Sequence, residues 1–454
     1  MEKFVEIITV ISDFMWGIPL IALITAIAVF LTVRTKGFQF RYIGHIFKNT
    51  FGTILDKGTG ETGITPWRAV CTSLACCVGT GNITGVAVAI GMGGPGALFW
   101  MWMVAVFGAI VKYGEILLAI TYRERDPLTS NYISGMPSIA KKGLDKKWHW
   151  LAHGFSIGAI LALVYGACLH TNGITEAITT AFDVSPALIG VACVVVVGVL
   201  IFGGFTRISA FAEMCVPIMS LAYIVVGLFI LLTHASALPH TFALIFKSAF
   251  TGQAATGGFA GSTVSMAITN GMARGVYSNE AGQGLAGFCH GNADCEHPGK
   301  QGLWGITEVF IDTIVICTFS GLVVLCTDTW ETGLVGSSMI TTAMAAGFGG
   351  NLKLASIFVS VMLTIFATTS LIANIYVAEI CAADYRNTMF VRNLVRIVSL
   401  VFVYFGCVGG LETMYVLTDF FMGIQVLFCL LILLLKSEEI ASITNDYIAK
   451  YIKK

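Results

Sequence analysis

The sequence predicts an all-α polytopic membrane protein with about eleven transmembrane helices, two of them broken within the bilayer. Of its 454 residues, 56% are hydrophobic and 11% are charged, and the mean hydropathy is +0.84. Soluble domains carry about a quarter charged residues, so little of this chain is expected outside the membrane. Nearly all of the thirteen cysteines lie in or at the ends of apolar stretches, without paired spacing, which argues against a disulfide framework.

Hydropathy divides the chain into apolar spans that are long enough to cross the bilayer as helices. The spans lie near 15–33, 66–92, 97–120, 150–172, 186–203, 209–233, 262–288, 304–326, 354–380, 394–410 and 414–435. The first span is expected to be retained in the protein, because no small-residue cleavage site follows its apolar run.

Lysine and arginine predict how the spans are oriented. If the N-terminus lies outside, the outer segments hold only Lys3, Lys247 and Lys353, and the inner segments hold most of the other basic residues. Basic residues favour the cytoplasmic side of a membrane. The sequence therefore predicts a multi-pass protein of the cell membrane with an external N-terminus, a cytoplasmic C-terminus and an odd number of spans.

The ten spans after the first form two sets of five with opposite orientation. On this division, residues 1–65 hold the first helix and a basic cytoplasmic loop, and 66–233 form the first five-helix repeat. Residues 234–435 form the second repeat, and 436–454 form a cytoplasmic tail.

The first member of the first set is interrupted at Val78-Gly79-Thr80-Gly81-Asn82. The two glycines favour an opened backbone, and Thr80 and Asn82 bring polar side chains into an apolar segment. Unpaired backbone groups cost several kcal/mol each in hydrocarbon, so such a break is tolerated where it lines a protein-enclosed cavity. The alternative is a continuous helix whose glycines pack closely on a neighbour.

The first member of the second set is also interrupted by glycine and polar residues. It reads Ala267-Ile-Thr-Asn270-Gly271-Met-Ala-Arg274-Gly275. Broken helices at matching positions of two inverted halves indicate the central site of a transporter. We therefore expect Asn270 and Gly271 to lie beside the first break at this site.

Several long motifs resemble the alanine or glycine:cation symporter family. They are residues 78–125, the segment Gly271-Met-Ala-Arg-Gly-Val-Tyr-Ser-Asn-Glu-Ala-Gly282, the pairs His297-Pro298 and Gln301-Gly302, and Ile311-Asp-Thr-Ile-Val-Ile-Cys-Thr318. The resemblance covers about residues 15 to 435. It implies a leucine-transporter-like fold of two inverted five-helix repeats that imports a small neutral amino acid with sodium by alternating access.

The expected partners follow from this resemblance and from the composition. They are a neutral amino acid, sodium as the co-transported ion and membrane lipid, with no cofactor, no nucleic acid and no obligatory protein partner. No nucleophile–base pair converges anywhere, so we do not expect an enzyme. A proton-coupled symporter and an uncoupled amino-acid facilitator or channel remain as alternatives.

The first break suits the carboxylate of an amino acid. An opened helix presents free N–H groups, and the positive end of the following half-helix attracts an anion. Thr80, Gly81 and Asn82 are therefore the candidates for holding the α-carboxylate.

Carbonyls at the end of the preceding half-helix, at Ala75 and Val78, suit a cation. Sodium requires further hard oxygen ligands from a second segment. In similar transporters a Thr-Ser pair on the ninth span completes a sodium site, and Thr369 and Ser370 match that pair. Their alternative role is a hydrogen bond back to the preceding turn of their own helix.

Charged residues within the spans are further candidates. Asp312 lies inside the eighth span, where a carboxylate is costly, and it either serves as an ion or amine partner or pairs with Arg274 or Lys112. Lys112 and Glu115 are three residues apart, which predicts a self-neutralising pair. Arg274 and Glu280 are expected to pair in the same way, with a possible gating role.

Three weaker signals have simpler explanations. Gly79-x-Gly81 lacks the βαβ context of a dinucleotide loop, and the sequon Asn82-Ile-Thr84 lies at bilayer depth. Cys289, His290, Cys295 and His297 have the composition of a metal site within 289–297. The two histidines belong to the family pattern and the cysteines do not, so we expect no transition metal there.

This chain departs from the family pattern at positions that bear on the substrate. On the fourth span His170 and Ala167 stand where the family has Gln and Asn, and on the ninth span Asn374 stands where it has Trp. Gly284-Leu-Ala-Gly287 replaces Gly-Ser-Ala-Pro. Placing His170 and Asn374 at the substrate side chain predicts a neutral substrate that is polar, or larger than alanine. The alternative is that His170 faces the outer vestibule.

Overall fold

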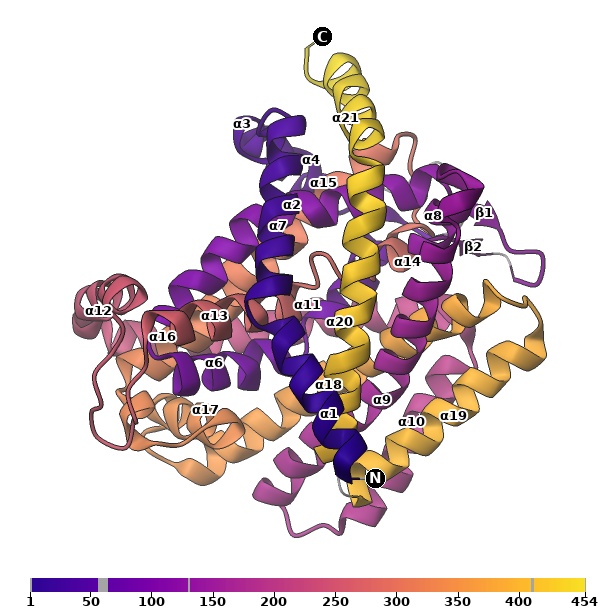
Figure 1. Ribbon diagram of the computed structural model, residues 1–454. Coiled ribbons are helices and arrows are strands. Elements are labelled where there is room, and N and C mark those ends of the chain that lie inside the picture. The colour runs from indigo at the N-terminus through magenta and orange to yellow at the C-terminus, as the bar shows by residue number, and fades with distance from the viewer. Residues whose placement is uncertain (1, 56–63, 130, 410–411, 454) are drawn as a thin grey trace.

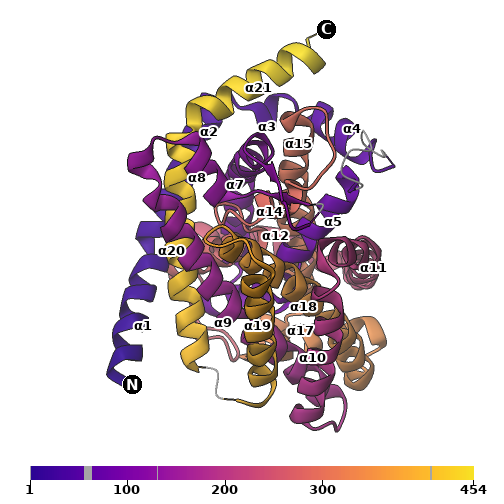
Figure 2. The ribbon, with the colours of Figure 1, turned by 90° about the vertical axis from the view of Figure 1, so that its right-hand side faces the viewer.

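Each predicted span coincides with a helical segment in the computed structural model, which describes residues 2–55, 64–129, 131–409 and 412–453 (Figure 1). Of the predicted basic loop, which ends at residue 65, residues 56–63 lie outside the described residues, and Phe38–Arg41 and Ile43–Phe51 form short helices. Figures 1 and 2 both place the two described ends of the chain at opposite ends of the molecule. We call the end that carries the N-terminus the outer end, after the predicted orientation.

The first half of the chain forms these helices: α1 Glu2–Trp16, α2 Ile18–Arg34, α3 Phe38–Arg41, α4 Ile43–Phe51, α5 Pro66–Cys77, the π-helix η1 Gly81–Gly85, α6 Val86–Gly93, α7 Gly96–Thr121, α8 Met136–Gly143, the 3-10 turn η2 Lys146–Trp148, α9 Trp150–Ala181, α10 Pro186–Ile201 and α11 Gly204–Thr233. One short hairpin joins α7 to α8, with β1 at Glu124–Arg125 antiparallel to β2 at Tyr132–Ile133.

The second half forms η3 Ala235–Ala237, α12 Leu238–Thr251, α13 Val264–Asn279, α14 Ala286–His290, α15 Pro298–Val309, the π-helix η4 Phe310–Cys317, α16 Thr318–Cys326, η5 Thr329–Thr332, α17 Gly336–Ala345, η6 Ala346–Phe348, α18 Leu352–Ala383, α19 Met389–Val408, α20 Glu412–Leu435 and α21 Ser437–Tyr451. Helix α12 was not among the predicted elements.

Eight helices in the described part of the chain are long and apolar enough to span a membrane, or nine if the bent pair Pro66–Cys77 and Gly81–Gly93 counts as one span. Helix α10 is a shorter apolar helix of the same kind. The total of eleven spans therefore remains a prediction. The apolar first span begins earlier than predicted, because α1 and α2 together cover Val5–Arg34.

Helix starts follow local capping chemistry. Thr65, Ser185, Thr263, Asn351 and Thr388 each accept a hydrogen bond from a backbone N–H in the first turn, which begins α5, α10, α13, α18 and α19. Proline follows in the first turn of α5 and α10, where its missing N–H costs nothing.

Helix α9 is central to the packing. It runs against α18, α20 and α19, whereas α7 packs against α13 and α15. Glycines allow the closest approaches: a Cβ on Gly158 of α9 would lie 2.9 Å from the backbone N of Gln425 in α20. Small residues at such crossings are typical of membrane bundles, in which van der Waals packing drives helix association.

The predicted C-terminal tail is an ordered helix that packs across the inner end of the bundle (Figure 2). Thr444 of α21 contacts the Tyr113 hydroxyl at 3.0 Å, and Asp446 contacts His297 Nε2 at 3.0 Å. Tyr447 is buried against Phe38. The sequence did not indicate this helix because it is too polar to resemble a span.

Candidate functional site

The first break is present where the sequence predicts it. Helix α5 ends at Cys77, the following half-helix is bent from it by 52°, and the Gly79 N–H donates to Asn82 Oδ1 at 2.9 Å. A Cβ on Gly79 would lie 2.6 Å from Ser370 Oγ, so this position requires glycine for close approach to α18. The N–H groups of Thr80 and Gly81 then open the second half-helix, whose first N–H groups lack intrahelical acceptors.

Asn82 has a different place from the one expected for a carboxylate ligand. Its side chain is fully buried, and its Nδ2 donates to Asp312 Oδ1 at 2.5 Å. Its backbone carbonyl accepts from Ser320 Oγ at 2.6 Å. Asn82 therefore holds the break in shape from behind, and Thr80 and Gly81 are the members of the predicted trio that face open space.

The second break lies about one helical turn or more beyond the predicted position, so the prediction of an opening at Asn270–Gly275 was wrong. Helix α13 is continuous to Asn279, because Gly271 and Gly275 are packing glycines. A Cβ on Gly271 would lie 2.3 Å from the Ala97 carbonyl oxygen of α7. Asn270 lies on α13 beside a separate outer pocket and donates to the Met266 carbonyl at 2.9 Å.

The actual opening occupies residues 280–285, between α13 and α14. Glu280 has φ +58°, Gly282 has φ +91° and Gly284 has φ +75°. Glycine adopts positive φ without steric cost, whereas a glutamate in this region is uncommon and marks a constrained site. These three residues end α13 and turn the chain into α14.

Asp312 joins the two breaks. It lies in the π-helix η4, and it accepts hydrogen bonds from Asn82 Nδ2 at 2.5 Å, Ser278 Oγ at 2.7 Å and Thr313 Oγ1 at 2.8 Å. Asn82 belongs to the first break and Ser278 to the last turn of α13. The expected pairing of Asp312 with Arg274 or Lys112 was wrong: within the described residues Asp312 forms no ion pair, and Lys112 contacts Glu308 instead.

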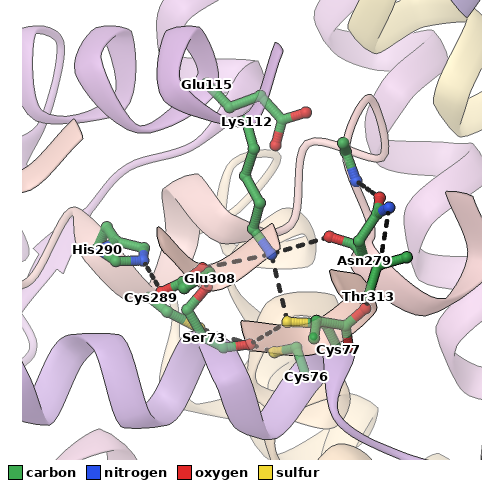
Figure 3. A network of polar contacts seen from close by, with 12 residues as sticks. Ser73, Cys76, Cys77, Lys112, Glu115, Asn279, Cys289, His290, Glu308 and Thr313 are labelled. Carbon is green, nitrogen blue, oxygen red and sulfur yellow. Dashed lines mark hydrogen bonds and ion pairs between the residues drawn. The ribbon is translucent and has the colours of Figure 1, made fainter. Parts of the chain in front are cut away.

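Lys112 is the second link between the breaks (Figure 3). Its Nζ lies 3.0 Å from the carbonyl oxygen of Asn279, the last residue of α13, and 3.3 Å from the sulfur of Cys77, the last residue of α5. It also lies 3.3 Å from Glu308 Oε2. One buried ammonium thus contacts a carbonyl at the negative end of α13, a side-chain sulfur at the end of α5 and a carboxylate.

The predicted Lys112–Glu115 pair was therefore wrong. Figure 3 shows the Glu115 carboxylate directed away from the contacts of Lys112, and Glu115 Oε1 accepts from the backbone N–H of Gly282 at 2.7 Å. The true partner, Glu308, also accepts from Ser73 Oγ at 2.9 Å and contacts His290 Nε2 at 2.7 Å. Spacing on one helix did not identify Glu308, since it comes from α15, nearly two hundred residues away.

The predicted Arg274–Glu280 pair was also wrong. Arg274 lies with its guanidinium carbon 6.0 Å from the ring centre of Tyr277, and it lines two outer pockets together with Asp419. Glu280 instead lines the central cavity, and the described residues offer no partner to its Oε2. The αL conformation of Glu280 turns its side chain away from the helical face that carries Arg274.

A narrow central cavity lies between the two breaks. Its lining includes Thr80 and Gly81 from the first break, Glu280 from the second, His170 from α9 and Asn374 from α18. His170 and Asn374 contact one another, with Nε2 and Nδ2 3.3 Å apart. His170 therefore lines the central cavity, and the lining of the larger outer pocket does not include it.

A larger cavity lies on the outer side of the central one. Both cavities are lined by Thr80, Gly81 and Tyr277, so the first break and one tyrosine separate them. Tyr277 and Thr418, which also line the central cavity, were missed by the sequence analysis. Tyr277 could have been proposed from the sequence, because it lies in the span that was expected to face the first break. Nothing in the sequence pointed to Thr418.

The predicted sodium ligands come from two segments, α5 with its end and α18, which pack against one another beside the first break. Thr369 and Ser370 are buried, and their hydroxyls contact the Phe366 carbonyl at 2.8 and 3.1 Å. Ala75 lies on α5 and Val78 directly follows this helix; both are buried, and α5 packs against α18. The back-bonding alternative describes both hydroxyls in this structure, and Ser370 Oγ also faces Gly79.

The four cysteines and histidines of 289–297 do not converge. His290 contacts Glu308, His297 contacts Asp446, and Cys289 Sγ lies 3.8 Å from Cys76 Sγ. Within the described ranges, no group of three or more histidine, cysteine, aspartate or glutamate side chains is arranged to hold a metal ion.

Comparison with known proteins identifies the family. The model of the sodium:alanine symporter family matches residues 1–454. The chain belongs to the sodium:alanine symporter family. Among curated relatives in this family, the sodium/alanine symporter AgcS of Methanococcus maripaludis is 34% identical, with 98% of this chain and 97% of the relative covered.

Two further relatives come from Bacillus subtilis. The uncharacterized transporter YflA is 35% identical over 98% of this chain and 94% of its own length, and the probable sodium/glutamine symporter GlnT is 32% identical over 98% and 91%. Among solved structures, a mutant of the Eremococcus coleocola manganese transporter aligns with a TM-score of 0.52 and 13% identity, over 82% of this chain and 76% of that one.

Family membership establishes a coarse function. The chain is a multi-pass membrane transporter for cation-coupled amino-acid transport and not an enzyme, with sodium as the co-transported ion of the sodium:alanine symporter family. The structural likeness confirms the predicted leucine-transporter-like helical fold.

Proposed function

We propose that this protein imports a neutral amino acid together with sodium by alternating access between its outer and inner ends. The start of the second half-helix at Thr80–Gly81 carries this proposal, because it lines both the central cavity and the larger outer cavity. A substrate that enters from outside therefore meets free N–H groups at the boundary between the two. The proposed sidedness rests on the distribution of lysine and arginine.

The two breaks suit the two charged groups of an amino acid. The N–H groups of Thr80 and Gly81, at the positive end of a half-helix, suit the α-carboxylate. The Glu280 carboxyl, which has an oxygen without a partner in the same cavity among the described residues, suits the α-ammonium. Asn82 supports the carboxylate-binding N–H groups indirectly, because its side chain accepts a hydrogen bond from the Gly79 N–H and so holds the break in shape.

Sodium is proposed to lie between α5 and α18. The carbonyls of Ala75 and Val78 and the hydroxyls of Thr369 and Ser370 are hard oxygen ligands of the kind sodium prefers. Both hydroxyls now contact the Phe366 carbonyl, and each keeps lone pairs for an ion. The side-chain end of the cavity, at His170 and Asn374, supports a substrate that is polar or larger than alanine.

Purified protein in sealed vesicles is expected to accumulate a neutral amino acid under an inward sodium gradient. The measurement is uptake of radiolabelled amino acids with external sodium, potassium or choline at constant pH. Equal flux with all three cations would contradict symport and support an uncoupled facilitator. Accumulation that follows an inward proton gradient without sodium would support the proton-coupled alternative.

Removing either proposed sodium-binding hydroxyl is expected to raise the sodium concentration needed for half-maximal uptake by about 10-fold or more. A hydrogen bond or contact to a charged group is worth about 1.5–3 kcal/mol, and about 1.4 kcal/mol corresponds to tenfold. The variants are Thr369→Ala and Ser370→Ala, measured as uptake against sodium concentration.

Thr364→Ala is the matched control for these variants. Thr364 lies on the same helix, and its hydroxyl bonds back to the Ser360 carbonyl at 2.7 Å in the same manner. Its sodium dependence should equal that of the parent. If the control shifts as much as Thr369→Ala and Ser370→Ala, the hydroxyls act on helix α18 and not on the ion.

A further inference from the structure

Four polar side-chain atoms around the central cavity have no hydrogen-bond partner among the described residues. They are His170 Nδ1, Glu280 Oε2, Asn374 Oδ1 and Thr418 Oγ1. Buried polar groups are almost always paired in folded proteins, so each exception needs an explanation. Here the four come from α9, α18, α20 and the opening after α13, and they border one space, which indicates that an occupant of that space supplies their partners.

The contact between His170 and Asn374 determines what this occupant must offer. Asn374 Nδ2 donates to His170 Nε2 at 3.3 Å, so in the neutral ring the proton is on Nδ1. The pair then leaves one donor, His170 Nδ1–H, and one acceptor, Asn374 Oδ1. Exchanging the amide oxygen and nitrogen of Asn374 reverses both roles and again leaves one donor and one acceptor.

Amino-acid side chains differ in how well they match this pair. Alanine and methionine side chains offer neither a strong acceptor nor a donor. A carboxylate offers acceptors alone and brings a second carboxyl group into the cavity of Glu280, and an ammonium offers donors alone. A carboxamide carries a carbonyl acceptor and an NH₂ donor on one planar group, so it can pair with both atoms at once. The Thr418 hydroxyl can donate or accept beside it.

We propose that the substrate of this transporter carries a side-chain carboxamide, which the His170–Asn374 pair and Thr418 bind at the side-chain end of the central cavity. This inference rests on the proposed function, since it assigns the atoms that remain after the α-carboxylate and α-ammonium are placed. Thr418 thereby becomes a specificity residue. A site built to hydrogen-bond a substrate group strongly rejects analogues that lack the group.

The test is sodium-dependent binding to the purified full-length protein. Radiolabelled glutamine is displaced by asparagine, methionine, glutamate, serine and alanine, with and without sodium. The expected result is that glutamine or asparagine binds at least about tenfold more tightly than methionine, glutamate, serine or alanine. Methionine matches glutamine in length without the amide, and glutamate matches its shape without the donor.

Variants then assign the preference to residues. Asn374→Leu and Thr418→Val should reduce the ratio of glutamine affinity to alanine affinity at least about tenfold, because alanine has no side-chain group that reaches these atoms. Equal displacement by methionine or alanine in the parent would overturn the carboxamide inference, and so would tighter binding of serine. The proposed function fails separately, if no neutral amino acid shows sodium-dependent binding or uptake. The affinity ranking of the amino acids is measured on the parent protein, so this part of the test does not depend on whether a variant folds.

Discussion

Replacing Lys112 by methionine is expected to lower the free energy of unfolding by about 3–5 kcal/mol, because it leaves the buried Glu308 carboxylate without its ammonium. The change also removes the cation that meets the Asn279 carbonyl at the end of α13 and the Cys77 sulfur at the end of α5 (Figure 3). Methionine keeps most of the side-chain volume, so the loss reports charge and not a cavity. The measurement is the unfolding midpoint of purified protein in detergent.

The paired substitution Lys112→Met/Glu308→Gln shows whether the lost stability comes from the unpaired Glu308 carboxylate or from the lost contacts at the two helix ends. Removing both members of a buried ion pair is often close to neutral, whereas removing one is costly. The double variant should therefore recover most of the lost stability, since glutamine still bonds Ser73 and His290. If the double variant is as unstable as Lys112→Met, the ammonium acts through the two helix ends and Glu308 contributes little.

The second large effect is expected for Asp312→Asn, which should reduce sodium-driven uptake by about 10–100-fold while the protein remains inserted. Asp312 accepts from Asn82, Ser278 and Thr313, and it thereby joins the first break to α13. In either orientation the new amide turns an NH₂ group toward at least one of these donors. A lost hydrogen bond to a charged group costs about 1.5–3 kcal/mol, which corresponds to this range of rates or affinities.

Asp328→Asn is the matched control for this substitution. Asp328 follows the same span, is exposed, and has φ +53°, a conformation that asparagine tolerates. Uptake by this variant should equal that of the parent, measured in the same vesicles at the same sodium concentration. Parent-like uptake by Asp312→Asn would show that the link between the breaks does not depend on the carboxylate.

Several parts of the site were predictable because they depend on local backbone chemistry. The first break appears within Val78–Asn82, where Gly79 and Gly81 together with Thr80 and Asn82 interrupt an apolar segment. The second break was predicted in the right span but at the wrong glycines. Gly271 and Gly275 differ from Gly282 and Gly284 only in what surrounds them: the first two face α7, and the last two adopt positive φ.

The sequence by itself determined that this protein is a helical membrane transporter with a broken helix at its centre. Membrane spans and glycine breaks can be recognised from the sequence because each depends on residues that are close together along the chain. Only the tertiary structure decided which charges pair. Lys112 bonds to Glu308 of α15 rather than to Glu115, and Asp312 bonds to Asn82. A buried charge takes whichever partner the packing of helices brings within about 3 Å, and that partner can come from any part of the chain.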